Sequence, residues 1–492
     1  MNTQQPVRVR FAPSPTGRTH LGSGRTALYN YLLARQTGGK FILRIEDTDQ
    51  KRYVPGAEEE LMDSLHWLGL EWDEGPDVGG SFGPYRQTER RDSYQKYAQQ
   101  LIDSGSAYYC FCSQSEDVQE VKRSRKHRDE CPYREMPAED TRARIVAGDP
   151  YVIRFKMPAV GTVTAVDALR GPITVDNSTL DDTILVKSDG LPVYHLAVVV
   201  DDHLMEITHV FRTSEWLPTF PLHVHLYQAL GWEQPIWIHP SIFLKPDGKG
   251  KMSKRDTAAL QESGQSIFLG DMHELGYLPE AVVNWMVLMG WSYDDHTEFF
   301  AMPDLIEKFS IEKLNPSPAA INFSKLDHFN GLHIRNLNTD DLAQRLLPFF
   351  ERAGINADLD TLRKIAPVLQ VRLVTLDESV EKAAFFFQAE VHPAPEDLIA
   401  KKMSAAESAL AAQRAYDLLA NLPEITHETA EEPMRQLAED MGIKVGQLYG
   451  IVRVAVTGQI VSPPLFESME IIGREKSLIR IKNAIDILHG IA

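Results

Sequence analysis

The stretch "VRVRFAPSPTGRTHLGSGRTALYNYLLARQ", residues 7–36, joins an alternating segment to a run of good helix formers through a tight turn. Residues 7–13 alternate polar and apolar side chains and end at a proline, which predicts a strand, and residues 22–36 predict a helix. "KFILRIEDTD" (40–49) predicts a second strand that runs into an acidic loop. A strand, a helix and a strand in this order favour a parallel βαβ unit at the start of an α/β fold.

Two glycines interrupt the predicted start of this helix. Gly22 and Gly24 are poor helix formers, so we interpret them as positions where a ligand approaches the backbone closely. Free N–H groups and the helix dipole favour an anion such as phosphate at a helix N-terminus, and His20 and Arg25 are candidate additional donors. The alternative is an ordinary glycine-containing loop with a structural histidine.

Composition argues against several classes of protein. The 492 residues suffice for about two to four domains, and the hydrophobic content of 43% is ordinary for a globular chain. No apolar run reaches the length of a membrane span, and the first residues lack the apolar core of a secretory signal. Three cysteines do not make a disulfide framework, so we expect a cytoplasmic protein. The net charge of −18 disfavours a broad basic nucleic-acid surface but is compatible with a local basic groove.

A second cationic segment lies far along the chain. "DGKGKMSKRDT" (247–257) carries Lys249, Lys251, Lys254 and Arg255 among small residues. A flexible, cation-rich loop can close on a polyphosphate and stabilise charge on a leaving group. By itself this loop could equally be an exposed, solvated segment. A phosphate-binding helix start together with a mobile lysine loop indicates chemistry that activates a substrate with a nucleotide.

These two segments resemble the signature motifs of class I aminoacyl-tRNA synthetases, "HLGS" (20–23) and "KMSKR" (251–255). Longer stretches are similar to the bacterial glutamyl-tRNA synthetase family, and the similarity runs from residue 7 to the end of the chain. They include "RFAPSPTG" (10–17), "RIEDTD" (44–49), "GPYRQTER" (83–90), "EWLPTFPLHVHLYQALGW" (215–232) and "KVGQLYGIVRVAVTG" (444–458). The resemblance implies ATP with Mg²⁺, L-glutamate and a glutamate tRNA as partners, and we expect a monomer.

The resemblance also implies a multidomain fold, α/β followed by all-α. Short strand-like pieces between Gly, Pro and Asp turns in residues 110–195 indicate an α+β insertion, and helical patterns dominate from about residue 335. We expect a Rossmann-type catalytic domain in two halves (1–109 and 196–241), an acceptor-binding insertion (110–195), a linking domain with the KMSKR loop (242–335) and a helical anticodon-binding region (336–492).

A site for free glutamate must hold two carboxylates and one ammonium, which calls for fixed guanidinium groups and an acidic partner. Arg10 ends the first predicted strand, where ligand-facing residues lie in open α/β sheets. The resemblance adds Arg212 as the second arginine, Glu46 as the ammonium partner, and Ser14 and Tyr194 as hydroxyl partners. The alternatives are a surface salt bridge for Arg212 and a turn or cap for Glu46.

The reaction that the resemblance implies has two steps, formation of glutamyl-adenylate and transfer of glutamate to the tRNA. His20, Lys251 and Lys254 are the expected catalytic residues because they would stabilise the pentacoordinate phosphorus and the leaving pyrophosphate. Gly22 and Ser253 complete the expected ATP site.

The chain departs from the family pattern at three positions. Thr213 and Ser214 stand where the family commonly has a Gly-Glu or Ala-Glu pair, and Ser23 stands where many class I enzymes have a second histidine. The first departure weakens any role at 213 and 214. Glutamyl enzymes often have a small residue at the position of Ser23, so that departure does not count against activity.

All three cysteines fall within a short segment. Cys110, Cys112 and Cys131 suit a tetrahedral structural Zn²⁺, with His127 or Tyr133 as the fourth ligand. The alternative is a set of free thiols in a loop, because some synthetases of this type have lost these ligands.

The helical C-terminal region is expected to read the anticodon. Basic residues fall on otherwise amphipathic segments, "LRKIAPVLQVRLVTL" (362–376) and "REKSLIRIKNA" (474–484). Arg372 falls where discriminating members of the family carry an arginine that reads the third anticodon base, and a good guanidinium contact to a base edge is worth roughly 1–3 kcal/mol. The alternative for Arg372 is a solvated helix face.

Several related functions stay open at this point. The enzyme could also charge glutamine tRNA, or the chain could be a catalytically inactive tRNA-binding protein, although intact "HLGS" and "KMSK" argue against inactivity. A truncated relative that glutamylates a modified tRNA base would lack the helical region. A glutaminyl enzyme usually ends in β-barrels, which this C-terminus does not resemble.

Overall fold

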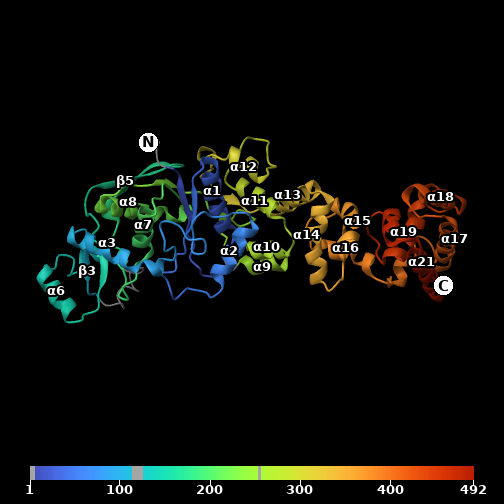
Figure 1. Ribbon diagram of the computed structural model, residues 1–492, viewed down its shortest axis with the longest axis horizontal. Helices are drawn as coiled ribbons and strands as arrows, with labels where there is room; N and C mark the ends of the chain where they lie inside the picture. The colour runs from blue at the N-terminus through green and yellow to red at the C-terminus, as the bar shows by residue number, and fades with distance from the viewer. Residues whose placement is uncertain (1–5, 113–125, 253–255, 492) are drawn as a thin grey trace. The chain divides into compact units, whose positions relative to one another are not determined.

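The computed structural model of the chain describes residues 6–112, 126–252 and 256–491 (Figure 1). The chain divides into two compact units, Met1–His273 with Pro279–Lys325, and Glu274–Leu278 with Leu326–Ala492. Two predicted ATP-site residues, Ser253 and Lys254, lie outside the described residues. None of the described helices is long and apolar enough to cross a membrane.

The predicted βαβ unit is confirmed. β1 (Arg8–Phe11) pairs in parallel with β2 (Lys40–Leu43), and α1 (Leu21–Thr37) connects them. The helix ends where Gly38 adopts a left-handed conformation with φ of 65°, which glycine accepts at little cost. All four residues of β1 are buried, as expected for a strand inside a parallel sheet.

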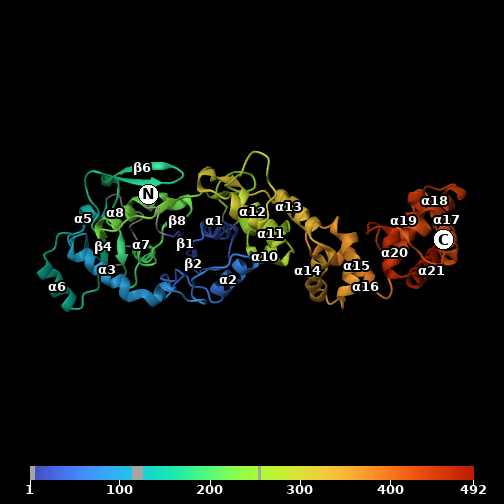
Figure 2. The same ribbon diagram turned by 45° about the horizontal axis from the view of Figure 1, so that its top comes forward.

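The main sheet has six strands in the order β2-β1-β8-β9-β5-β6. β8 (His209–Phe211) and β9 (Ile236–Ile238) continue the parallel part, and α8 (Phe220–Leu230) connects them. The antiparallel hairpin of β5 (Thr162–Asp167) and β6 (Gly171–Asp176) joins β9 through Asp167. Figure 2 shows this hairpin beside α8. A hairpin from the segment predicted as an insertion therefore extends the main sheet.

A second, antiparallel sheet occupies the rest of residues 107–186. It has three strands, β3 (Ala107–Cys110), β4 (Val152–Phe155) and β7 (Ile184–Val186). Two short helices accompany it, α5 (His127–Glu130) and α6 (Ala138–Val146). Strands and helices of this kind are the α+β character expected for the insertion.

The other elements of the first unit surround the main sheet or follow it in the chain. They are α2 (Ala57–Trp67), α3 (Arg91–Asp103), α7 (Tyr194–Leu204), α9 (Asp256–Glu262), α10 (Leu269–Glu274), α11 (Pro279–Leu288), α12 (Met302–Lys308) and the short strands β10 (Phe243–Leu244) and β11 (Ala319–Ala320). α3, α7 and α8 together contribute half of the buried residues of a large apolar core.

The described residues of the second unit form helices and connecting loops, and none of them forms a strand (orange and red in Figure 1). Its helices are α13 (Phe323–Asn336), α14 (Thr339–Arg352), α15 (Leu359–Gln370), α16 (Glu378–Phe387), α17 (Ala405–Asn421), α18 (His427–Asp440), α19 (Val445–Thr457), α20 (Leu465–Ile472) and α21 (Arg474–Ile491). The predicted fold class, α/β followed by all-α, is confirmed.

One basic residue of the last helix serves packing. Arg480 is buried and donates through Nη1 to the Val456 carbonyl, at 2.6 Å, and through Nη2 to the carbonyls of Phe385 and Gln388, at 2.8 and 2.7 Å. Burial lowers its pKa to about 10. Carbonyls at helix C-termini lack intrahelical partners, so this guanidinium caps α16 and α19 together. Among the basic residues of 474–484, which the sequence offers as support for anticodon binding, Arg480 therefore serves packing instead.

Candidate active site

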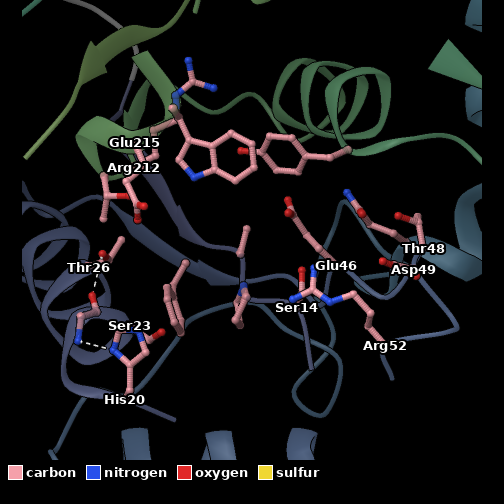
Figure 3. A pocket seen from close by; sticks show the side chains of 18 of the residues that line it. Ser14, His20, Ser23, Thr26, Glu46, Thr48, Asp49, Arg52, Arg212 and Glu215 are labelled. Carbon is pink, nitrogen blue, oxygen red and sulfur yellow. Dashed lines mark hydrogen bonds between the residues drawn. The ribbon is translucent and has the colours of Figure 1, made fainter. Parts of the chain in front are cut away.

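A cavity of about 1390 Å³ opens in the first unit, at the carboxyl ends of β1 and β8 and beside the N-terminus of α1. In Figure 3, His20 and Ser23 of α1 lie on one side of it, and Ser14 and Glu46 lie on the other. The structure brings together at this cavity eight of the predicted site residues: Arg10, Ser14, His20, Gly22, Glu46, Tyr194, Arg212 and Lys251.

The N-terminus of α1 is capped by a histidine. His20 Nδ1 accepts a hydrogen bond from the Gly22 amide at 2.7 Å, so this ring nitrogen is unprotonated. A Cβ on Gly22 would lie 2.5 Å from His20 Cε1, which explains the glycine by the imidazole that folds over it. A Cβ on Gly24 would lie 3.0 Å from Leu269 and 3.2 Å from Met286 Sδ. Gly24 therefore serves the packing of α1 against α10 and α11, and its interpretation as room for a nucleotide is wrong.

Arg25 is not a phosphate donor. Its side chain is buried, and it donates to the carbonyls of Met289 and Ser241. Its guanidinium carbon lies 3.8 Å from the centre of the Phe243 ring, a cation–π contact. Arg25 ties α1 to the segments that follow β9 and α11, and the prediction of an additional anion donor is wrong for this residue.

The predicted substrate residue Arg10 already has a carboxylate partner. Its Nε and Nη2 donate to both oxygens of Asp202, at 2.9 and 3.1 Å, and its Nη1 donates to the Phe211 carbonyl. Asp202 also accepts from Arg44 Nη1 at 2.8 Å. All three charged side chains are buried, so the floor of the cavity is a compensated ion network.

Glu46 lies at the edge of this network. Its Oε1 accepts from Arg44 Nη2 at 3.1 Å, and its side chain is 6% exposed. Burial raises the pKa of Glu46 to about 7, although Arg44 and Arg10 act in the opposite direction. Near neutral pH this carboxyl therefore responds readily to a new cationic neighbour.

Arg212 differs from Arg10, the other predicted substrate arginine, because every group that it contacts directly is neutral. Its Nε donates to His239 Nε2 at 2.8 Å, and its Nη1 donates to His223 Nδ1 at 2.7 Å. Its Nη2 is buried and has no hydrogen-bond partner among the described residues. The guanidinium lies over Trp237 at 4.6 Å and near Phe220 at 5.5 Å, and burial lowers its pKa. Its positive charge is thus poorly compensated.

Two residues that sequence reasoning missed complete the rim. Trp216 stacks on Tyr194 with ring centres 4.3 Å apart and an interplanar angle of 29°. Glu215 forms an ion pair with Lys251, the first lysine of the KMSKR segment. Both lie a few residues after β8, in "RTSEW", and they begin the stretch 215–232 that is similar to the family, but nothing in that stretch marks them as site residues.

A second constellation lies in the insertion, as predicted. The Cys110 and Cys131 sulfurs are 3.7 Å apart, those of Cys112 and Cys131 are 3.9 Å apart, and His127 Nε2 is 3.4 Å from Cys110 Sγ. These spacings exceed a disulfide bond of about 2.05 Å but match a tetrahedral zinc site, in which thiolate sulfurs about 2.3 Å from the metal lie about 3.8 Å apart. The ligand atoms of the four residues lie within 4.8 Å of one another.

Tyr133, the other candidate for the fourth ligand, packs against the cluster that contains Cys110, whereas the Nε2 atom of His127 lies 3.4 Å from Cys110 Sγ. The Tyr133 ring makes an edge contact with Phe111 at 5.4 Å, and the Arg144 guanidinium lies 5.0 Å from its centre. The geometry therefore favours His127.

Arg372, the predicted anticodon residue, lies exposed in the turn after α15 and not on a helix. The pKa of Arg453 on α19 is lowered first by the burial of Arg453 and second by the positive charge of Arg372. The guanidinium of Arg372, in this turn, thus lies near that of Arg453 on α19 within the second unit.

Comparisons with known proteins agree with this architecture. Residues 6–328 match the family described as tRNA synthetases class I (E and Q), catalytic domain, and residues 341–485 match an anticodon binding domain. The chain thus belongs to the class I aminoacyl-tRNA synthetases. Its similar relatives define its place more closely, within the glutamate–tRNA ligase family.

Those relatives span almost the whole chain. A glutamate–tRNA ligase of Chloroflexus aurantiacus is 45% identical over 507 aligned positions, covering 99% of both chains. One of Dehalococcoides mccartyi is 46% identical over 484, covering 97% of this chain and 98% of its own. The crystal structure of a glutamate tRNA ligase from Elizabethkingia meningosepticum, in complex with its amino acid, superimposes with a TM-score of 0.88 at 36% identity, covering 98% of this chain and 99% of its own.

Proposed function

We propose that this chain attaches L-glutamate to the 3′ end of glutamate tRNA at the expense of ATP. The observation that carries this assignment is the pairing, in one cavity, of a buried and poorly compensated guanidinium on Arg212 with the histidine-capped N-terminus of α1. The first suits a carboxylate, and the second suits phosphate oxygens. The match over both family regions supports the same assignment.

The reaction proceeds in two steps. An oxygen of the glutamate α-carboxylate attacks the α-phosphorus of Mg·ATP, and the bond to the bridging oxygen breaks, which releases pyrophosphate and leaves glutamyl-adenylate. A hydroxyl of the terminal ribose of the tRNA then attacks the acyl carbon, loses its proton and displaces AMP. Neither step uses a protein nucleophile, so the enzyme acts by positioning and by stabilising charge.

We assign the roles as follows. Arg212, Arg10, Ser14, Tyr194 and Glu46 bind glutamate, with Glu46 accepting from its ammonium. His20, the Gly22 backbone, Lys251, Ser253 and Lys254 bind the ATP phosphates, and His20 and the two lysines stabilise the charge that develops there. Lys251 would exchange its partner Glu215 for phosphate oxygens.

The domain assignment remains that predicted above, with residues 110–195 gripping the acceptor end, 242–335 contacting the tRNA stem and 336–492 reading the anticodon. We propose that Arg372 contacts the third anticodon base. We further propose that the protein is cytoplasmic, because its three cysteines are spaced for a metal and not for disulfides. We also propose that it is a monomer.

Aminoacylation of purified glutamate tRNA and glutamine tRNA, measured side by side, tests this function. Charging of glutamate tRNA alone is expected, and charging of both tRNAs would identify a non-discriminating enzyme. Arg372→Gln should narrow any preference for glutamate tRNA over glutamine tRNA, measured as the ratio of their kcat/KM values, because a glutamine side chain both donates and accepts at a base edge. If no tRNA supports ATP–pyrophosphate exchange with glutamate, the chain is a tRNA-binding protein without activity.

One zinc per chain is the expected metal content. Cys110, Cys112, Cys131 and His127 would hold it, and because the tetrahedral set is complete, the metal would hold the insertion together without taking part in the reaction. Elemental analysis of metal-replete protein should find one zinc. His127→Ala should weaken zinc binding at least about 100-fold, whereas Tyr133→Phe, the matched control, should retain the metal. Loss of zinc in the tyrosine variant and retention in the histidine variant would reverse the choice of ligand.

The pKa of Glu46 predicts how glutamate binding depends on pH. The carboxylate form binds the ammonium as an ion pair, whereas the protonated carboxyl offers only an uncharged acceptor, so protonation below its pKa of about 7 should weaken binding. The kcat/KM for glutamate in ATP–pyrophosphate exchange, with tRNA present, should fall about tenfold per unit below pH 7 and level off above it. Glu46→Gln should give a lower, flat profile. A wild-type profile that is flat between about pH 5.5 and 8 would contradict this role.

A further inference from the structure

A continuous chain of buried hydrogen bonds runs through Arg212. Asp167 Oδ2 lies 2.7 Å from His239 Nδ1, and Arg212 donates to His239 Nε2 at 2.8 Å and to His223 Nδ1 at 2.7 Å. His223 Nε2 in turn lies 2.9 Å from His195 Nδ1. This hydrogen-bond chain therefore connects β5 with the first turn of α7, by way of the residue after β9 (His239), the residue after β8 (Arg212) and a residue within α8 (His223).

The protons of this chain follow from one chemical fact. A guanidinium only donates hydrogen bonds, so both ring nitrogens that face Arg212 must be acceptors. His239 then carries its proton on Nδ1 and donates it to Asp167, and His223 carries its proton on Nε2 and donates it to His195. Both rings are neutral. Burial lowers the pKa of His223 and of His239, which is consistent with this protonation.

Because both imidazole partners of Arg212 are neutral, its positive charge is compensated less than that of Arg10. The neighbouring Arg10 is held on both nitrogens by Asp202, so its charge is cancelled at contact distance. Arg212 is held equally firmly on two nitrogens, but its carboxylate, Asp167, is one imidazole ring away. The hydrogen bonds from Arg212 to the two neutral imidazole rings therefore hold the guanidinium in place without neutralising it. Its positive charge stays available to an anionic ligand.

We propose that His223 and His239 are positioning residues for substrate recognition: as neutral acceptors they fix the Arg212 guanidinium while leaving its charge for a carboxylate of glutamate, and Asp167 and His195 hold the two rings in the required tautomers. This inference rests on the proposed function, in which Arg212 binds glutamate. It assigns a role in glutamate recognition to four residues from four separate segments of the chain.

The two histidines face Arg212 through different nitrogens, and this allows a test that a merely structural role would not pass. The carbonyl of asparagine can take the place of Nδ1, and that of glutamine can take the place of Nε2. His223→Asn therefore keeps the acceptor for Arg212, and His223→Gln loses it. At position 239 the order reverses, because there the acceptor is Nε2 and glutamine keeps it.

The readouts are KM for glutamate and KM for ATP in pyrophosphate exchange with tRNA present, and the rise in Tm on addition of glutamate alone. His223→Gln and His239→Asn should raise KM for glutamate about 10- to 100-fold and abolish the glutamate-induced rise in Tm, with KM for ATP and kcat nearly unchanged. His223→Asn and His239→Gln should stay within about threefold of wild type. The matched control is His225 on α8, a buried histidine that forms a hydrogen bond with Asn177 through Nε2 and takes no part in the hydrogen-bond chain through Arg212. His225→Asn and His225→Gln should therefore have the same KM for glutamate.

The reversed order at the two positions decides the outcome. The same order at both positions, or equal changes in KM for ATP and for glutamate, would overturn the positioning role. If the variants at one position do not fold, the other position decides alone: KM for glutamate must rise in the variant that loses the acceptor (His223→Gln or His239→Asn) and stay near wild type in the one that keeps it, and any other order overturns the role. Arg212→Met separates the two proposals: an unchanged KM for glutamate there would refute the glutamate site itself, whereas a raised KM with no reversal at the histidines would refute only their role.

Discussion

Replacing Arg212 with methionine is expected to lower kcat/KM for glutamate by roughly 10²- to 10³-fold, mainly through KM. Methionine keeps the apolar length that packs near Trp237 and Phe220 but removes the charge. A carboxylate that enters the cavity then loses a buried, charged donor. Because interaction with a bound substrate is lost in the ground state and the transition state alike, kcat should change little.

The same variant should lose little stability. Removing a buried cation that no carboxylate contacts is favourable, and this gain offsets the loss of the donor that His239 Nε2 and His223 Nδ1 share. Preference for glutamate over glutamine should shrink, because a neutral pocket no longer favours the carboxylate. ATP–pyrophosphate exchange with each amino acid and thermal unfolding of both proteins measure these effects. A variant that loses stability while keeping its KM for glutamate would show that Arg212 is structural.

Arg44→Met is expected to have the opposite pattern, a loss of stability of about 3–5 kcal/mol. Arg44 is fully buried and donates to Asp202 at 2.8 Å and to Glu46 at 3.1 Å, with Asp201 at 3.8 Å. Removing it leaves a cluster of buried carboxylates with too few cations. The matched control is Arg35, whose side chain is 25% exposed and pairs with Asp73 at 2.7 Å, and Arg35→Met should cost at most about 1 kcal/mol.

The chain offers a selective probe for this measurement. All seven tryptophans, at positions 67, 72, 216, 232, 237, 285 and 291, lie in the first unit. Their fluorescence during urea unfolding therefore reports on the unit that contains Arg44.

The sign of the pH dependence provides a second check on Arg44. The folded-state pKa of Glu46 is already raised to about 7, and loss of Arg44 raises it further, so in the variant the penalty grows as pH rises through that range. The difference in stability between wild type and Arg44→Met should therefore be larger at pH 8 than at pH 5. Equal differences at both values would mean that the buried carboxylates are not responsible.

The sequence by itself determined the features that depend on residues close to one another along the chain. Alternation in residues 7–13 and the helix formers after Gly24 are local signals, and they predicted the parallel unit of β1, α1 and β2. The spacing of Cys110, Cys112 and Cys131 predicted a metal-binding group because the ligands lie within one short segment. The similarity of separated motifs predicted which residues meet at the cavity, and eight of them line it.

Only the tertiary structure decided what each side chain contacts. The sequence predicts Arg25 as an anion donor and places Arg480 in a basic segment of the anticodon-binding region, yet each is buried against backbone carbonyls from distant segments. Asp167 and His239, which hold Arg212 from one side, carry no local pattern that links them. The physical reason is that periodicity reports which face of an element is apolar, whereas the partner of a buried polar group is set by the packing of elements far apart in the chain. The pairing of a charged residue with neutral partners is therefore a property of the folded chain alone.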